Sequence, residues 1–240
     1  MLRFSLIFLA LLLPVAAFQL PANSSQCLVG TADGWDSSHV TLSYFEKSGG
    51  QWKPVGAPWK GRLGKTGLVW GKGLSPVPSG AATKREGDNR SPAGVFALGG
   101  AWGYDASIQK NPKQFYRQVT SRDLWVEDPK SPLYNQFVEL DHEPATAWEK
   151  KQQMKQGDYA HALKLFIAHN PPPNAVPNGG SSIFFHIWRG GGSIPSAGCT
   201  TMEKSKLQWV ISRIDPARNP LYVLLPESEY RKNKERWKLP

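Results

Sequence analysis

Short apolar or alternating runs, separated by turn-forming residues, dominate the chain. Residues 40–45 alternate between apolar and polar side chains, and Gly49 and Gly50 then predict a hairpin whose second strand covers residues 51–55. Continuous apolar runs at 183–188 and 221–225 predict buried strands. Similar runs predict further strands at 27–30, 68–70, 95–98 and 163–168. This pattern is typical of a mainly β protein.

Two segments have a helical pattern instead. Residues 145–156 are rich in Glu, Lys, Gln and Ala and end at Gly157, which predicts a helix. Apolar residues recur at helical spacing between Leu207 and Ile214. The segment from Arg231 is polar and basic, and we expect it to be solvated. We therefore predict a mainly β fold, a sandwich or a barrel, with two or three packed helices.

Composition supports a single folded domain made of short elements. The chain has 240 residues, of which 23 are Gly, 20 are Pro and only 20% are charged, which excludes a disordered chain or a coiled coil. No repeat or long linker divides it, so we expect a lead-in at 18–26, one domain at 27–226 and a basic tail at 227–240. The net charge of +10 implies an anionic partner, and on charge alone nucleic acid, a membrane surface or an acidic wall polymer all qualify.

The first 17 residues have the three parts of a secretory signal: Arg3, an apolar run at 4–15, and the small residues Ala16 and Ala17. We predict cleavage after Ala17 and a periplasmic or cell-envelope location, which argues against an intracellular nucleic-acid reader. The alternatives are an uncleaved anchor or a buried helix. No later stretch is long enough to span a bilayer.

The densest chemical feature lies between residues 183 and 200. His186 lies in an apolar strand, three glycines follow at 190–192, and Cys199 comes thirteen positions after the histidine. An adjacent imidazole can generate the thiolate that a cysteine needs as a nucleophile, and the glycines leave N–H groups free for an oxyanion hole. Thr200 and Glu203 have the spacing of a capping box, which predicts a helix directly after Cys199 and a lowered thiol pKa. The alternative is a structural cysteine and an unrelated histidine.

These residues resemble a known signature. Ser196-Ala-Gly-Cys199, downstream of His186, resembles the active-site motif of L,D-transpeptidase catalytic domains. Residues 90–96 (RSPAGVF) are similar to a second family segment, and residues 84–88 with Tyr134-Asn135 resemble features of one subgroup. The resemblance covers about residues 27–225. It implies a β-sandwich or barrel-like catalytic fold that acts on peptidoglycan stem peptides without a cofactor.

The resemblance also implies roles for individual residues. Cys199 would attack the carbonyl between the third and fourth stem residues, and His186 would serve as base and acid. The carbonyl of Ile187 would orient the histidine ring, and the N–H groups of Cys199 and Gly198 would hold the oxyanion. Substrate-binding residues are expected among Ser196, Arg189, Lys84, Arg85, Tyr134 and Asn170.

The chain departs from the family pattern at two places. Thr201 stands where members commonly have an Arg, and Ile187-Trp188 follows the histidine where members commonly have Gly. Arg189 or Arg85 is the expected substitute for the missing cation, which would bind the stem carboxylate. The other histidines lack metal-ligand spacing, so we expect no metal site. We expect Cys27 to be a buried strand thiol, although a disulfide with Cys199 competes with the nucleophile assignment.

Three functions remain open from the sequence. The first is an acyl-transferase that makes 3→3 cross-links or exchanges D-amino acids. The second is an L,D-carboxypeptidase or endopeptidase on the same site, and the third is a non-catalytic wall-binding protein. Peptidoglycan stems are the expected partner, with no nucleic acid and no membrane span after signal cleavage. The oligomeric state stays open.

Overall fold

The computed structural model describes residues 18–240, in which eleven strands form one sheet and two more form a separate hairpin. The predicted signal segment, residues 1–17, lies outside the described residues. Along residues 18–240 no helix combines the length and the apolar character needed to cross a membrane.

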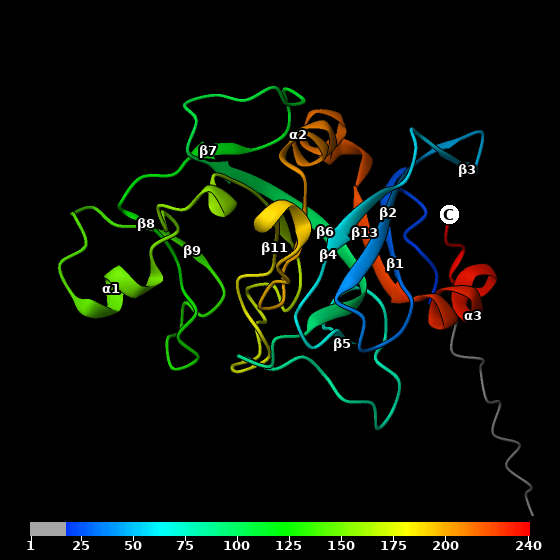
Figure 1. Cartoon of the computed structure of the whole chain (residues 1–240), viewed down its shortest axis with the longest axis horizontal. Coiled ribbons are helices and arrows are strands. Elements are labelled where there is room, and N and C mark those ends of the chain that lie inside the picture. The colour runs from blue at the N-terminus through cyan, green and yellow to red at the C-terminus, as the bar shows by residue number, and fades with distance from the viewer. Residues whose placement is uncertain (1–17) are drawn as a thin grey trace, which may run out of the picture.

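Eight strands of the large sheet close into a ring (Figure 1). Its order is β1-β13-β6-β10-β11-β12-β4-β2, and β2 pairs back onto β1. The members are β1 (Gln26–Ala32), β13 (Leu221–Pro226), β6 (Ser91–Gly103), β10 (Leu163–Ile167), β11 (Phe184–Ile187), β12 (Thr200–Met202), β4 (Trp59–Arg62) and β2 (His39–Ser48). Three short strands pair at its margins: β3 (Gln51–Pro54), β5 (Leu68–Trp70) and β7 (Tyr116–Gln118). The prediction of a mainly β, barrel-like fold is confirmed.

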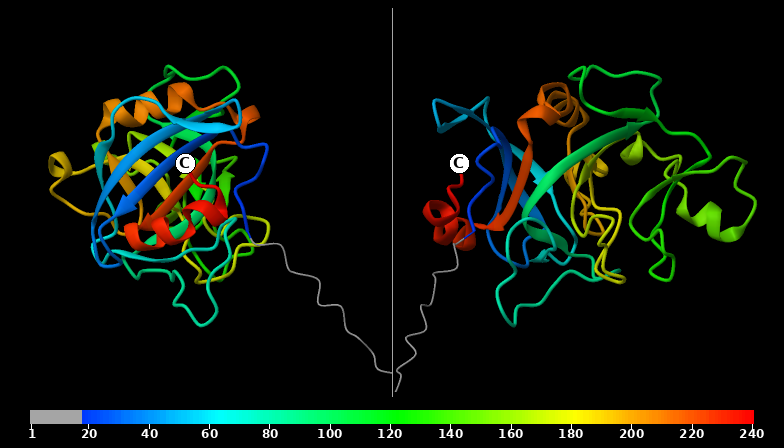
Figure 2. Two further views of the ribbon diagram at one scale, coloured as in Figure 1. Left: turned by 90° about the vertical axis from the view of Figure 1, so that its right-hand side faces the viewer. Right: turned by 180° about the vertical axis from the view of Figure 1, so that it is seen from behind.

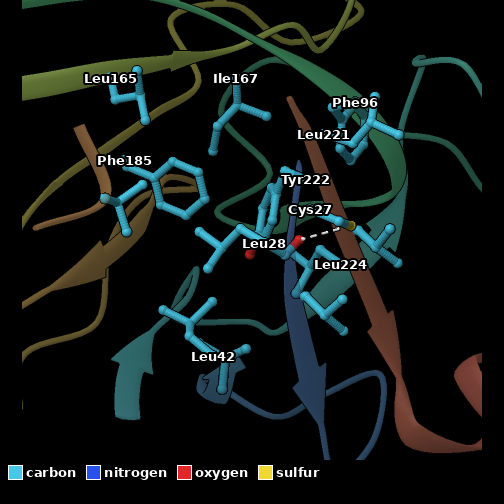
Figure 3. Close-up of a cluster of buried hydrophobic side chains, with 14 of the residues drawn as sticks. Cys27, Leu28, Leu42, Phe96, Leu165, Ile167, Phe185, Leu221, Tyr222 and Leu224 are labelled. Atoms are coloured by element: carbon cyan, nitrogen blue, oxygen red, sulfur yellow. Dashed lines mark hydrogen bonds between the residues drawn. The ribbon is translucent and has the colours of Figure 1, made fainter. Parts of the chain in front are cut away.

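Apolar side chains fill the inside of the ring (Figure 3). Leu28, Leu42, Phe185 and Tyr222 are each at most 2% exposed. Cys27 belongs to the same cluster as a buried free thiol, and Cys199 is also free, so the competing prediction of a disulfide is wrong.

A second apolar cluster covers part of the outer face of the barrel. Because side chains alternate along a strand, Phe184 points away from the interior that Phe185 fills. Phe184 packs with Phe166 of β10 and with Trp125, whose ring centroid lies 4.8 Å from that of Phe184. Trp125 belongs to the hairpin of β8 (Asp123–Trp125) and β9 (Phe137–Glu139). This cluster therefore fixes the hairpin against the barrel wall that carries His186.

Three helices complete the described part of the chain. α1 (Ala147–Gln152) is shorter than predicted and lies beside the hairpin, at the opposite end of the molecule from α3 (Figures 1 and 2). α2 (Lys204–Arg213) packs its buried face on β10 and β11, as the spacing of its apolar residues predicted.

α3 (Glu227–Trp237) corrects the prediction of a solvated tail. It packs on β1 and β13, and Trp237 is 3% exposed with its ring 5.2 Å from that of Phe18. Only a few apolar side chains make this contact, and they were too sparse to stand out among the charged residues around them.

Candidate active site

The pairing of β11 with β12 brings His186 and Cys199 to the same wall. The strands run parallel with His186 opposite Thr201, and Cys199 directly precedes β12. His186 shares the outward side of β11 with Phe184. The Cys199 sulfur lies 3.4 Å from the Phe184 nitrogen, which donates to it, and 3.5 Å from the Ser182 oxygen.

Both side chains line one cleft of about 350 Å³. Its other walls come from segments far apart in the sequence, and they include Lys84, Glu86, Glu127, His161 and Arg189. The cleft therefore carries charges of both signs around the thiol.

The segment after Cys199 is not a helix terminus. Residues 200–202 form strand β12, and α2 begins only at Lys204 with Glu203 as an N-cap that makes no side-chain hydrogen bond. The predicted capping box is wrong because Thr200 and Thr201 pair in the sheet. No helix dipole therefore acts directly at the sulfur.

The pKa of Cys199 is raised, which corrects the predicted lowering. Burial is the largest cause; the hydrogen bond from the Phe184 N–H and the charges of Lys164 and Lys84 oppose it, while Glu127 adds to it. Lys164 lies opposite His186 on β10, is 4% exposed, and donates to the Met154 oxygen at 2.8 Å. Burial lowers the pKa of Lys164 to about 8, against the attraction of Cys199 and Glu127.

His186 is held as a neutral imidazole. Its Nδ1 lies 2.9 Å from the Ile187 oxygen, so Nδ1 donates and Nε2 is left as the acceptor. Burial, followed by the nearby His161, lowers the pKa of His186 to about 3. No hydrogen bond joins the Cys199 sulfur to His186 in residues 18–240, and catalytic hydrogen bonds often tighten only when substrate binds.

Ser196 holds the backbone around the thiol. Its hydroxyl accepts from the Gly198 N–H at 3.0 Å and donates to the Cys199 oxygen at 2.5 Å. The Gly198 N–H is therefore occupied, whereas the Cys199 N–H has no partner among the described residues. Of the two N–H groups expected to bind an oxyanion, only that of Cys199 is available.

Two of the expected binding residues line the cleft as cations. Lys84 is 3% exposed and pairs with Asp88 at 2.5 Å, and Arg189 pairs with Asp158 at 2.6 Å. Each positive charge is therefore already partly neutralised before substrate arrives.

The other expected residues do not line this cleft. Arg85 is exposed outside it. Tyr134 is buried and donates its hydroxyl to Glu86. Asn170 is buried and binds the backbone of Val176 and Gly180, so it shapes the loop between them. Tyr134 and Asn170 therefore support the walls of the cleft and do not face the thiol, and Arg85 lies outside it.

Three titratable residues near the thiol could not be assigned to the site from the sequence: Lys164, His161 and Glu127. Lys164 had a readable signal, since it is the single charge in an apolar strand. His161 is one of the histidines without metal-ligand spacing, but Asp158 three residues earlier is a sequence signal for an Asp–His pair. Glu127 had no signal, because only the fold brings it to the cleft.

The position where family members commonly have an Arg is buried in this protein. Thr201 is 2% exposed and lies directly opposite Arg62 of β4. Arg62 donates to the Gly192 oxygen at 3.2 Å, which ties the glycine loop to the barrel. An Arg at position 201 would be buried next to a like charge, so Thr fits where the family's cation would not.

Comparison with known proteins identifies a family and two distantly similar crystal structures. Two crystal structures of the helical cell shape determining protein Pgp2 from Campylobacter jejuni, one of a point mutant, are similar at 12% identity with TM-scores of 0.38 and 0.36. The likeness covers 88% of this chain and 51% and 50% of those chains, so this chain spans about half of their length. No curated protein matches. Residues 59–223, well over half of the chain, match the L,D-transpeptidase catalytic domain (YkuD), and the chain belongs to this family.

Proposed function

We propose that the chain is an exported cysteine acyl-transferase acting on peptidoglycan stem peptides. Cys199 would attack the carbonyl between the third and fourth stem residues, form a thioester and release the terminal D-residue. An amine of a second stem, or a free D-amino acid, would then take the acyl group. The observation that carries this proposal is a thiol, a neutral histidine and an unpaired Cys199 N–H around one cleft in a family of L,D-transpeptidases.

The proposed roles follow from the contacts. His186 takes the thiol proton on Nε2 and returns it to the leaving amine, while the Ile187 carbonyl keeps the ring oriented. The Cys199 N–H stabilises the oxyanion, and Ser196 fixes that N–H in place by binding the peptide groups on either side. Lys84 and Arg189 are the proposed partners of substrate carboxylates, each through the part of its charge that Asp88 or Asp158 leaves free.

Export is part of the proposal and rests on the signal-like pattern of residues 1–17. The net charge of +10 suits an anionic wall polymer. N-terminal sequencing of the envelope protein should begin at Phe18. An intact Met1 would contradict the cleaved, periplasmic form.

The function is tested with a purified tetrapeptide muropeptide, incubated with and without a free D-amino acid. Exchange of the terminal residue or a 3→3 dimer, seen by mass spectrometry, is the expected result. Tripeptide alone, at a rate indifferent to added amine, would identify a carboxypeptidase. Binding to peptidoglycan with no product, unchanged in Cys199→Ala, would identify a wall-binding protein.

A further inference from the structure

A second histidine faces the same cleft as His186. His161 closes the short 3₁₀ turn Tyr159–His161, and its ring centroid lies 4.9 Å from that of His186 with the planes 33° apart. Its side chain is 14% exposed and lines the cleft. Unlike His186, which is 3% exposed, His161 keeps an edge open to a ligand.

His161 is oriented as a base. Its Nδ1 lies 2.6 Å from a carboxylate oxygen of Asp158, whose other oxygen accepts from Arg189 at 2.6 Å. Burial opposes the ionisation of Asp158, but the hydrogen bonds from Arg189 and His161 lower its pKa to about 2, so it stays a carboxylate. The proton of the neutral ring therefore sits on Nδ1, and Nε2 has no partner within residues 18–240. A base oriented by a carboxylate is a recurring arrangement in covalent catalysis.

The charges around His161 favour different forms of the ring. Burial and the cations Lys164 and Arg189 lower its pKa, whereas Asp158 raises it. His186 stacks on the ring but is itself strongly disfavoured as an imidazolium. The pKa of His161 is lowered overall, so its ring is neutral at rest with Nε2 able to accept a proton, and Asp158 would stabilise the imidazolium that forms.

A larger hollow of about 540 Å³ borders the same turn, and in this inference it is the entry site for the acceptor. It is lined by Asp158, Tyr159, Trp188 and Lys204, and it shares Arg189 with the catalytic cleft. An amine that enters from this hollow would pass the Asp158–Arg189 pair, next to His161, on its way to the thioester.

We propose that His161, oriented by Asp158, is the base of the second half-reaction and takes a proton from the acceptor amine. The inference rests on the acyl transfer proposed above. In this step the amine nitrogen bonds to the thioester carbon, the C–S bond breaks, and the N–H proton passes to Nε2 of His161. The Cys199 thiolate then recovers a proton from the imidazolium, so the enzyme returns to its starting state.

The test separates the two half-reactions by following the acyl-enzyme mass. The purified protein receives a tetrapeptide muropeptide, and a D-amino acid is added after the thioester has formed. His161→Gln should form the thioester within about twofold of the wild-type rate and lose it to the amine about 100-fold more slowly, the usual worth of a general base. Asp158→Asn should slow the same step. If His161→Gln disturbs folding, His161→Phe is the second variant, because it keeps an aromatic ring beside His186. His186→Gln is the matched control that should form no thioester.

Two results would overturn the inference. Equal losses in thioester formation and decay would mean that His161 only positions His186, and unchanged decay in both His161 variants would mean that it handles no proton. A wild-type protein that forms no thioester would instead overturn the acyl-transfer proposal, and this inference with it.

Discussion

Cys199 is a half-buried thiol whose surroundings act on its pKa in both directions. Burial raises the pKa, while the Phe184 N–H and the charges of Lys164 and Lys84 lower it. His186, with a pKa near 3, does not form a stable imidazolium in the free protein. Cys199 therefore rests as a thiol, and in the proposed mechanism it would lose its proton only when substrate is in place, not in a preformed ion pair.

Removing the buried cation Lys164 tests how far a nearby positive charge lowers the pKa of Cys199. Lys164→Met should raise the pKa of Cys199, because the thiolate loses an attractive charge. A rise of about one pKa unit would lower the thiolate fraction about tenfold. Read by mass spectrometry, alkylation of Cys199 by iodoacetamide at pH 7, where Lys164 with its pKa of about 8 is mostly charged, should slow by about tenfold, while Lys164→Arg keeps the charge and most of the rate. Equal alkylation rates in wild type and Lys164→Met would contradict this account. Cys27, fully buried, should stay unlabelled in all three proteins.

Thr201 carries a buried hydroxyl without a hydrogen-bond partner in the described residues. Thr201→Val replaces that hydroxyl with a methyl group of similar shape. It should therefore raise the free energy of unfolding by about 1 kcal/mol, since an unpaired buried polar group is lost. Urea unfolding measures this directly. A clear loss of stability would contradict this account, whereas a loss of acyl transfer at unchanged stability would show that the hydroxyl serves the substrate.

At the scale of elements, the hydroxyl of Ser196 bridges the two ends of the turn from Ser196 to Cys199. Ser196→Ala leaves the buried Gly198 N–H unpaired, at a cost of about 1–3 kcal/mol in unfolding free energy. The Cys199 N–H should also lose its fixed direction, so we expect thioester formation to slow by at least about tenfold. Ser196→Thr, which keeps the hydroxyl, should retain most of both properties. Thioester formation at the wild-type rate in Ser196→Ala would show that Ser196 does not position the N–H group that binds the oxyanion.

Elements with strong local patterns were predictable, and elements set by tertiary contacts were not. The apolar runs around Leu165, Phe185 and Val223 are strands because they are buried on both sides or line the barrel. The capping-box pattern at Thr200 failed because pairing with β11 holds this segment extended. A genuine capping box occurs instead at Thr146, at the start of α1. Both threonines have a Glu three residues later, so the local sequence predicts a capping box at each. Only the pairing of the Thr200 segment with a neighbouring strand distinguishes the two sites.

At the scale of the molecule, the site lies on the outside of the barrel, where a second apolar cluster fixes the β8–β9 hairpin. Cys199 and His186 were found from sequence because the strand, loop and thiol are close together along the chain. Glu127 and His161 come from two other segments, and only the fold brings them to the same cleft, while Lys164 lies buried behind it, opposite His186. Sequence spacing does not show how deeply the thiol is desolvated or that a strand follows it, so the direction of the Cys199 pKa shift was predicted wrongly.

Buried neutral histidines make the stability of the whole molecule sensitive to acid. His169 is fully buried; its Nδ1 accepts from the Lys72 N–H at 3.1 Å and its Nε2 lies 2.9 Å from the Gly179 oxygen, so a second proton would face a donor. Burial lowers the pKa of His169 to about 4 and that of His186 to about 3. Between pH 6 and 4 the unfolded chain therefore binds protons at these positions that the folded protein does not, and stability must fall as the pH falls.

We expect the free energy of unfolding to drop by roughly 2–3 kcal/mol per pH unit in this window, since each such histidine contributes up to about 1.4 kcal/mol per pH unit. His142, exposed beside Asp141 and Glu149, has a raised pKa, so its contribution to stability grows as the pH falls. The observed slope should therefore stay below the sum of the His169 and His186 contributions. Urea unfolding at several pH values measures the slope, and His169→Gln should reduce it by about half whatever its effect on absolute stability. A slope that His169→Gln leaves unchanged would mean that this histidine is protonated in the folded protein, against the hydrogen bonds that hold it neutral.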